Sequence, residues 1–502
     1  MQCSLFTSAL LALSLTLMGC GVRSSTWSSK DLVIHWNTPG IVIRTIPTLQ
    51  VVVNPHLLPG DRLGAAAFDA VRTLEPEYVR LQAWIPYPRL AVAELKPPKA
   101  ESTSWDFTLI DPMVDEFMTA TAGHPSVIDF STIPQWMFAT ESPVPYPDDP
   151  KQATWNYEQG TDLRDPTLTE LADYYRRIAG WYVNGGFTDE NGRWRDSGRR
   201  YQFPIWEVLN EPDSEHGTSA EEYTRRYDAI VDAVRSASPN TRFMGLSLAQ
   251  PAAHLDFIRY FLNPSNHLPG IPIDYISYHF YAVPGSQETI DDWQYSLFQQ
   301  TDKFLDTVQS IEAIRTQLSP ATKTDIDEFG SILPTDAPPA VGVTPLPKWW
   351  NLSAAVYAYT WVKLARMRIE IVGESQLIGF PTQYQSLSMM DWSTNKPNAR
   401  FWALKLLKDS FHPGDRMIDT SLNSALALDV EGQGYITSSG RKLLLINKRN
   451  RAIEIALPMG GDAAILTVDT QSAEGPARTM APMNGSVTLQ PFAVTVVNWN
   501  AS

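Results

Sequence analysis

The segment "FPIWEVLNEPDSEH", from Phe203 to His216, joins an apolar run to an abruptly polar ending. A short apolar run bounded by turn residues predicts a buried strand, which here would deliver Asn210 and Glu211 at its carboxyl end. The same residues also suit the start of a helix, with Asn210 as cap, Pro212 in the first turn and Glu211 favoured by the helix dipole. The rest of the chain decides between these interpretations.

A rhythm of strand followed by helix extends from this segment in both directions. The strand-like runs are TLQVVVNP from Thr48, EYVRLQAW from Glu77, SVIDFST from Ser126, the run from Gln202, RFMGLSLAQ from Arg242, IDYISYHFY from Ile273, KTDIDEFG from Lys323 and SQLIGFPT from Ser375. Amphipathic segments such as SAEEYTRRYDAIVDAVRSA, from Ser219, lie between them. Eight such units predict an α/β fold, a (β/α)8 TIM barrel over residues 44–412.

The pattern of apolar residues changes after the last helical segment, NARFWALKLLKDS from Asn398. Short alternating runs such as RKLLLINK and AIEIALPM then follow one another, separated by turns. This pattern is typical of a small β-sandwich, which we expect over residues 413–502. Residues 20–43 are expected to form a tether and early strands, which either extend the sandwich or cap the barrel floor.

The first residues, "MQCSLFTSALLALSLTLMGCG", predict an export signal. The apolar stretch from Ala9 to Met18 is too short to span a bilayer. "LMGC" resembles a bacterial lipobox, so residues 1–19 would be a lipoprotein signal peptide and Cys20 the lipidation site, although no Lys or Arg precedes the apolar stretch. We therefore expect an exported protein, periplasmic or at the cell surface, anchored to the membrane as a lipoprotein.

Charge and composition limit the kinds of molecule that the protein is expected to bind. The 502 residues carry a formal net charge of -15, which argues against nucleic acid or an anionic membrane surface as partner. Contact with a membrane is thus expected only through the N-terminal lipid. Sixteen Trp and 19 Tyr fill cores, but they also offer flat faces on which sugar rings stack.

Two glutamates fall at predicted strand ends, where the chemistry of a TIM barrel takes place. Glu211 ends the fourth strand and Glu328 ends the seventh, so the two can face each other across the barrel mouth. Cleavage of a glycosidic bond needs such a pair, one carboxyl protonated and the other ionised. Alone, Glu328 also fits a solvated charge. The segments "EPDSEH" and "DIDE" lack an established metal-ligand spacing, and no metal or other cofactor is expected.

Further polar and aromatic side chains accompany the two glutamates. His279 and Tyr281 alternate onto one face of the sixth strand, and Arg80 within the second strand needs a carboxylate partner if it is buried. Trp136 and Trp392 follow the third and eighth strands and suit either the core or sugar stacking.

The residues as a set resemble the retaining glycoside hydrolases of clan A, and most closely glycoside hydrolase family 39. "WEVLNEPD" is similar to the strand-four acid/base motif of that family, and "TDIDEFG", "IDYISYHFYA" and "YVRLQAW" are similar to its strands seven, six and two. The resemblance implies Glu211 as acid/base and Glu328 as nucleophile. It also implies that Asn210 holds the sugar 2-hydroxyl and that His279 and Tyr281 line the subsite.

The sequence departs from the family at three places, one of which is strand three, "DFSTIPQW", which matches only loosely. The family often has His two residues after the strand-two Arg, where this chain has Gln82, a candidate substrate contact. The segment "LPTDAPPAVGVTPLPKWWN" after strand seven has no counterpart, and with Trp349 and Trp350 it suggests a substrate wall or a protein contact.

We therefore expect a retaining glycosidase acting on oligo- or polysaccharides of plant or microbial origin, with a xyloside or arabinoside as possible substrate. An endo-acting clan A hydrolase of another family is one alternative. A non-catalytic carbohydrate-binding lipoprotein is the other, although a pure binder has no need of both glutamates.

Overall fold

The computed structural model describes residues 26–141, 144–154, 160–336, 345–381, 384–458 and 462–500. The predicted signal peptide and Cys20 lie outside these residues. Within the described part of the chain, no helix combines the length and apolar character needed to cross a membrane.

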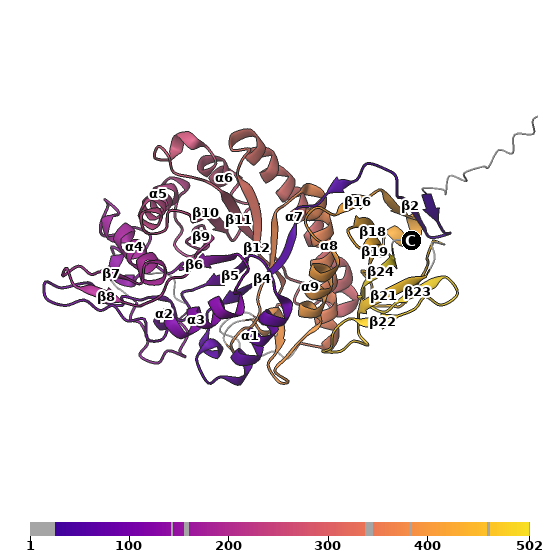
Figure 1. The fold of residues 1–502 in the computed structure, drawn as a ribbon, viewed down its shortest axis with the longest axis horizontal. Helices are drawn as coiled ribbons and strands as arrows, with labels where there is room; N and C mark the ends of the chain where they lie inside the picture. Colours follow the sequence, from indigo (N-terminus) through magenta and orange to yellow (C-terminus); the bar gives the residue numbers. More distant parts are fainter. Residues whose placement is uncertain are drawn as a thin grey trace, which may run out of the picture.

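Eight parallel strands close into a barrel, as the sequence predicts (Figure 1). They are β4 (Ile46–Val52), β5 (Val79–Gln82), β6 (Ser126–Asp129), β9 (Ile205–Val208), β10 (Arg242–Leu248), β11 (Tyr275–Ala282), β12 (Lys323–Ser331) and β13 (Ile371–Glu374). Each strand pairs with the next along the chain, and β13 pairs with β4 to close the ring. The carboxyl ends of all eight strands therefore meet at one mouth.

A helix follows each strand and covers the outside of the barrel (Figure 1). These helices are α1 (Arg62–Leu74), α3 (Asp111–Ala120), α4 (Thr169–Val183), α5 (Ala220–Ala237), α6 (Leu255–Phe261), α7 (Ile290–Leu318), α8 (Pro347–Met367) and α9 (Ala399–Ser410). Local sequence fixes several of their starts: the side chain of Ser219 caps α5 by accepting a hydrogen bond from the Glu222 N–H. One apolar face of α5 is then buried against the barrel.

The eighth strand lies a few residues before its predicted position. The prediction placed it from Ser375, but β13 comprises Ile371–Glu374. Closure of the ring determines this register, because Ile371 pairs with Ile46 of β4. The apolar run after β13 instead passes over the barrel mouth, where the Leu377 N–H donates to the Gln50 carbonyl at 2.9 Å.

The C-terminal residues form a separate antiparallel module, shown in yellow in Figure 1. Its main sheet has the order β22-β21-β24-β19-β18-β16-β3, with β22 (Arg478–Met480), β21 (Ala463–Val468), β24 (Val494–Asn500), β19 (Gly440–Asn447), β18 (Val430–Thr437), β16 (Arg416–Ile418) and β3 (Ile41–Val42). β1 (Thr26–Ser28) and β2 (Leu32–His35) form a second sheet with β17 (Thr420–Leu422), and β20 (Ile453–Ala456) pairs with β23 (Ser486–Leu489). The early strands thus belong to this module and do not cap the barrel floor.

The two tryptophans after the seventh strand do not form a substrate wall. Trp349 and Trp350 lie near the start of α8 and are buried. The Trp349 indole N–H donates to the Ser386 carbonyl at 2.9 Å, and its ring packs edge-on against Trp293. The rest of that predicted loop, residues 337–344, lies outside the described residues.

Candidate active site

Glu211 is placed at the barrel mouth by a turn directly after β9. The chain leaves the strand through Leu209 and Glu211, which both have positive φ angles, 63° and 41°. The Glu211 N–H donates to the Ser247 carbonyl of β10 at 3.0 Å, which holds the turn in place. The next helix, α5, begins only at Ala220, so the helix-start interpretation of this segment is wrong.

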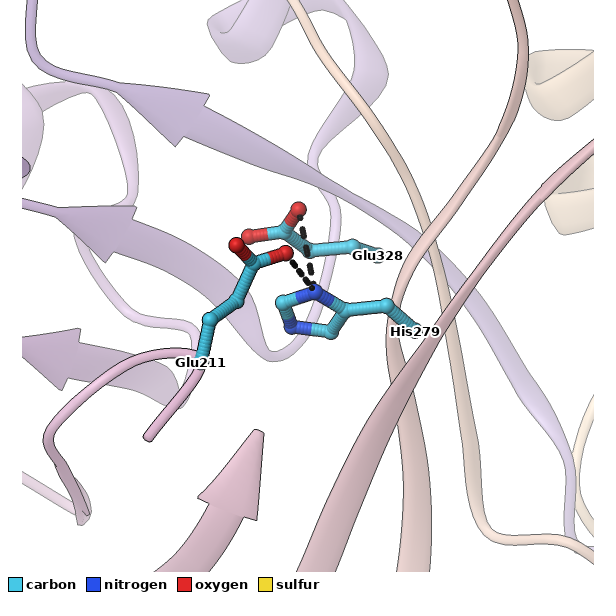
Figure 2. Close-up of side chains that lie close together, drawn as sticks. All are labelled: Glu211, His279 and Glu328. Carbon is cyan, nitrogen blue, oxygen red and sulfur yellow. Dashed lines mark hydrogen bonds and ion pairs between the residues drawn. The ribbon is translucent and has the colours of Figure 1, made fainter. Parts of the chain in front are cut away.

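Glu211 and Glu328 approach each other across the mouth, with His279 between them (Figure 2). One oxygen of each carboxyl group lies within 4.8 Å of the other. Nδ1 of His279 is 2.9 Å from Oε1 of Glu211 and 3.5 Å from Oε2 of Glu328. β9, β11 and β12 therefore bring three side chains, distant in sequence, to one point.

His279 is held in its protonated form. Burial alone would lower its pKa, but the charges of Glu328 and Asp327 raise it well above the usual value. Its Nε2 lies 2.7 Å from Ser247 Oγ and 3.2 Å from Asp327 Oδ2. A protonated imidazole pairs with the charges of both carboxylates; a metal ion held by these three side chains would have to displace that proton.

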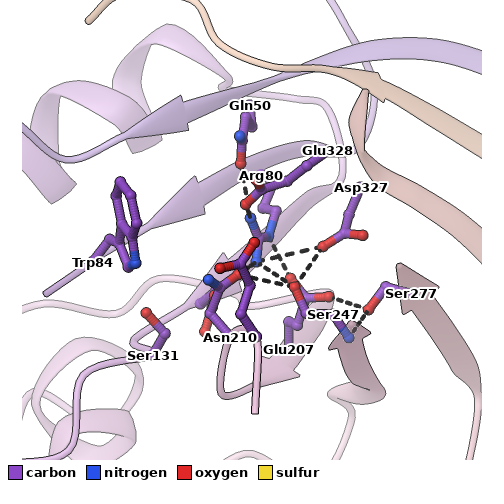
Figure 3. A network of polar contacts seen from close by, with 12 residues as sticks. Gln50, Arg80, Trp84, Ser131, Glu207, Asn210, Ser247, Ser277, Asp327 and Glu328 are labelled. Atoms are coloured by element: carbon purple, nitrogen blue, oxygen red, sulfur yellow. Dashed lines mark hydrogen bonds and ion pairs between the residues drawn. The ribbon is translucent and has the colours of Figure 1, made fainter. Parts of the chain in front are cut away.

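Arg80 of β5 contacts Glu328 and is the centre of a buried charge network (Figure 3). Its guanidinium contacts four carboxylates, those of Asp129, Glu207, Asp327 and Glu328. The sequence predicted one such partner. Among side chains, only that of arginine presents five N–H donors in a fixed fork, so it can donate to several carboxylates at once.

Glu328 is fixed at both oxygens. Arg80 Nη1 donates to Oε1 at 2.7 Å, and the Tyr281 hydroxyl donates to Oε2 at 2.5 Å. The same hydroxyl is 2.9 Å from Ser375 Oγ, which accepts from Gln50 Nε2. These contacts stabilise negative charge on Glu328 and aim it into the mouth.

A cavity of about 350 Å³ opens above the two glutamates. Its lining comprises Gln50, Val52, Gln82, Trp84, Asn210, Glu211, Tyr281, Glu328, Ile332, Ser375, Gln376, Tyr384 and Leu387. Gln82 is almost fully buried, and its Nε2 has no hydrogen-bond partner among the described residues. A buried donor in this state is suited to a ligand hydroxyl.

The structure does not bring the two predicted stacking tryptophans to this cavity. The Trp136 indole N–H donates to the Glu94 carbonyl, and the Arg164 guanidinium lies 4.5 Å from its ring centroid. The ring of Trp392 packs near His56. Both tryptophans are half-buried against the barrel core and are absent from the cavity lining.

Trp84 and Glu215 belong to the site, and sequence reasoning missed both. The Trp84 indole N–H and the Asn210 Nδ2 donate to Oε1 of Glu215, at 2.5 and 3.0 Å. Burial, followed by the charge of Glu211, raises the pKa of Glu215 to about 8. A signal existed: Glu215 lies in the strand-four segment, and Trp84 ends the second strand-like run.

Family models match two parts of the chain. The model described as "Glycosyl hydrolases family 39" matches residues 193–338, which include both glutamates and His279. The protein is a glycosidase that is similar to family 39 over this part of the chain. A second model, "D-apionate lactonase, C-terminal immunoglobulin-like domain", matches residues 428–497 of the C-terminal module of the glycosidase. A search of curated proteins finds no match to the sequence.

Solved structures share the fold of the glycosidase at low sequence identity. The family 51 arabinofuranosidase from Xanthomonas axonopodis pv. citri is 12% identical, with a TM-score of 0.60 over 92% of this chain and 97% of that chain. A family 51 alpha-L-arabinofuranosidase from Bifidobacterium longum is 14% identical, with a TM-score of 0.58 over 92% and 97%. A family 30 endoxylanase from Clostridium papyrosolvens C71 is 15% identical, with a TM-score of 0.54 over 92% and 98%. These likenesses show the fold, a TIM barrel with an appended β module.

Buried acids make the stability of the glycosidase dependent on pH. Burial raises the pKa of Glu374 to about 7, and burial together with Glu190 raises that of Glu94 to about 8. Like Glu215, these carboxyls bind a proton more tightly in the folded than in the unfolded chain. Folded protein then carries more protons than unfolded protein, so the free energy of unfolding falls as pH rises toward 8.

We expect the midpoint of thermal unfolding to be lower at pH 8 than at pH 6.5. Protonated His279 changes stability in the same direction over this range. His216, with a pKa lowered to about 4, opposes the trend, but this effect fades as pH rises above the ordinary histidine pKa. Differential scanning fluorimetry in buffers of equal ionic strength measures the slope. Glu94→Gln removes one of the acids and should flatten it; equal slopes for both proteins would contradict the assignment.

Proposed function

We propose that the protein is a retaining glycosidase that works by double displacement with Glu328 as nucleophile and Glu211 as acid/base. The observation that carries this proposal is the close approach of the two carboxyl groups, with oxygens within 4.8 Å. Retaining glycosidases hold the pair about 5–5.5 Å apart, whereas inverting enzymes need about 6.5–9.5 Å for an intervening water.

The surroundings of Glu328 suit a nucleophile. Its carboxylate accepts hydrogen bonds from Arg80 and Tyr281, which stabilise negative charge on it and orient it before the substrate arrives. One oxygen attacks the anomeric carbon and forms a glycosyl ester as the bond to the leaving oxygen breaks. Tyr281 stays beside the ester oxygen and positions it for the second step.

The surroundings of Glu211 suit an acid/base that exchanges protons with the leaving group and with water. Its side chain is 21% exposed, against 8% for Glu328. Its proton passes to the departing oxygen in the first step. In the second step the Glu211 carboxylate takes a proton from water, whose oxygen attacks the anomeric carbon and releases Glu328. His279 beside Oε1 stabilises the negative charge that Glu211 carries between the two steps.

The cavity favours a neutral sugar at the point of cleavage. Among the described residues that line it there is no Lys or Arg, and its side-chain donors are amides, hydroxyls and the indole of Trp84, which already donates to Glu215. Gln82 Nε2 and the second N–H of Asn210 Nδ2 suit sugar hydroxyls. A xyloside or arabinoside is thus favoured over a uronide. The arabinofuranosidases and the endoxylanase of like fold support the same choice.

We place this activity outside the cytoplasm, with Cys20 as a lipid anchor. The support is the lipobox-like "LMGC" ending of the apolar N-terminal stretch. Metabolic labelling with a palmitate analogue should mark the full chain and leave Cys20→Ser unlabelled; equal labelling of both chains would exclude this anchor.

Stereochemistry of hydrolysis tests the mechanism. Protein beginning after Cys20 is incubated with a panel of neutral aryl glycosides, and proton NMR follows the first sugar released. We expect the anomer of the substrate to appear first. First appearance of the opposite anomer would overturn retention. Cleavage restricted to longer oligosaccharides would indicate an endo-acting enzyme, and binding without any cleavage would indicate a carbohydrate-binding protein.

A further inference from the structure

A second cavity, of about 520 Å³, lies between α9 and the main sheet of the C-terminal module. It shares no lining residue with the catalytic cavity. Cavities between two packed units of a chain are common ligand sites. This cavity, called the module cleft below, plays no part in the mechanism above.

One face of α9 and one face of the sheet form the module cleft. The helix contributes Trp402, Lys405, Leu406 and Asp409, which recur at helical spacing. The sheet contributes Lys442 of β19, Asn498 of β24 and Ala464 of β21, which are direct cross-strand neighbours and so share one face. Lys442 Nζ donates to the Ser410 carbonyl at the end of α9, at 2.8 Å, which ties the two walls together.

The charge of the module cleft is opposite to that of the whole chain. Lys405, Lys442 and Arg441 line it, against one carboxylate, that of Asp409. Asp409 pairs with Lys405 at 2.8 Å, and the Arg441 guanidinium lies over the rings of Trp27 and Trp36. No carboxylate of a described residue lies within ion-pair distance of Lys442, which is therefore the cation left to meet a ligand. In a chain with 55 acidic and 40 basic residues, such a local excess of positive charge favours an anionic ligand.

The module cleft also offers groups that suit a sugar ring. Trp402 is half-buried, and its indole N–H donates to the carbonyls of Pro397 and Glu474, so the ring is fixed in place. The side-chain amide of Asn498 makes no hydrogen bond with a described residue and is not fully buried. A fixed aromatic ring beside a free amide and a lysine can bind a hydroxylated ring that carries an acid.

We propose that the module cleft binds an acidic sugar, with the carboxylate of a uronosyl residue at Lys442, its hydroxyls at Asn498 and its ring against Trp402. The choice of a sugar to carry the carboxylate rests on the proposed glycosidase function; the need for an anion follows from the cleft itself. The catalytic cavity favours a neutral sugar residue, so the two sites would recognise different parts of one glycan. The catalytic cavity would bind the neutral residue whose linkage is cut, and the module cleft would hold the glycan on the protein through an acidic residue.

Titration calorimetry with trigalacturonate and with its carboxyl-reduced neutral analogue tests the proposal. The protein is the chain after Cys20 carrying Glu328→Ala, so hydrolysis does not interfere and the outcome does not depend on whether the wild type cleaves anything. We expect the acidic trisaccharide to bind, added salt to weaken it, and the neutral analogue to bind at least tenfold more weakly. Equal affinity for both, or no binding of trigalacturonate at millimolar concentration, would overturn the proposal.

Variants locate the bound sugar. Lys442→Met and Asn498→Ala should each weaken trigalacturonate binding at least tenfold. Asn498 makes no hydrogen bond between helix and sheet, so Asn498→Ala remains informative even if Lys442→Met folds poorly. Lys448→Met is the matched control, since this lysine is also buried enough for its pKa to be lowered but lies outside the cleft. Unchanged affinity in both cleft variants, or an equal loss in Lys448→Met, would refute the assignment.

Discussion

Glu328→Ala is expected to reduce the rate of aryl glycoside hydrolysis on the order of 10⁴- to 10⁶-fold, the range seen when a covalent nucleophile is removed. The substitution deletes the atom that attacks the anomeric carbon and leaves Arg80 and Tyr281 without the carboxylate that they orient. Stopped assays with a glycoside of a good leaving group measure the loss. Residual activity above about a hundredth of wild type would show that another group is the nucleophile.

Azide separates the two glutamates. In Glu328→Ala the small anion occupies the place of the missing carboxylate and attacks from the same side, so it should yield a glycosyl azide of inverted configuration. In Glu211→Ala the ester still forms with a good leaving group, and azide then attacks the ester and yields the retained product. Glu77→Ala, at an exposed position outside the cavity, controls for handling and should match wild type. Exchange of the two azide products would exchange the two roles.

The sequence predicted the barrel because its signal is repeated. Eight strand-like runs with intervening amphipathic segments survive an error in any one of them. The error occurred at the eighth, where Ser375–Thr382 and Ile371–Glu374 are both plausible strands by composition. Hydrogen bonding decided: β13 must pair with both β4 and β12, and only the earlier segment is in register with Ile46 and Asp325. The paired strands lie far apart in the chain, so the local sequence of either segment does not show which of the two pairs.

Predicted site residues on or directly after strands reach the site, whereas two predicted residues in loops do not. Glu211 directly follows β9, and His279 and Glu328 lie in the carboxyl-terminal halves of β11 and β12, so topology alone brings them to one mouth. Trp136 and Trp392 lie in connections after strands, where the path of the loop decides which way a ring faces. Side chains along a strand point alternately to its two faces, but no such rule gives the direction of a side chain in a loop. Composition also does not distinguish an aromatic ring of the core from one that stacks on a sugar.

The extent of the charge network under the site could not be predicted either, although each member is visible in the sequence. Glu207 and Asp327 each lie within predicted strands, where they have no obvious partner. They are stable there because Arg80 reaches both from β5 and because His279 adds a second positive charge. Burial alone would raise the pKa of Asp327, but the charges of His279 and Arg80 lower it to about 2. Arg80 and His279 together thus offset the negative charge of the buried acids beneath Glu211 and Glu328, which are called the floor of the site below.

Arg80→Met should therefore be among the most destabilising single substitutions in the chain, at about 3–5 kcal/mol at pH 8, because it leaves several buried carboxylates without their cation. Without Arg80 the folded-state pKa values of these acids rise, so the folded variant binds more protons than the unfolded one and regains stability as pH falls toward 5. Urea unfolding at pH 5 and pH 8 measures both effects.

Arg400→Met provides the matched comparison. Arg400 is as deeply buried as Arg80, but it contacts one carboxylate, that of Glu374, and otherwise donates to the carbonyls of Leu387 and Ser375. Its loss should also destabilise the fold, with a smaller difference between pH 5 and pH 8, because a single carboxyl has to be protonated instead of several. If Arg80→Met were as stable as wild type at pH 8, the acids of the floor would already be protonated in the native protein. Arg80 would then serve only to orient Glu328, and the damage would appear in the catalytic rate alone.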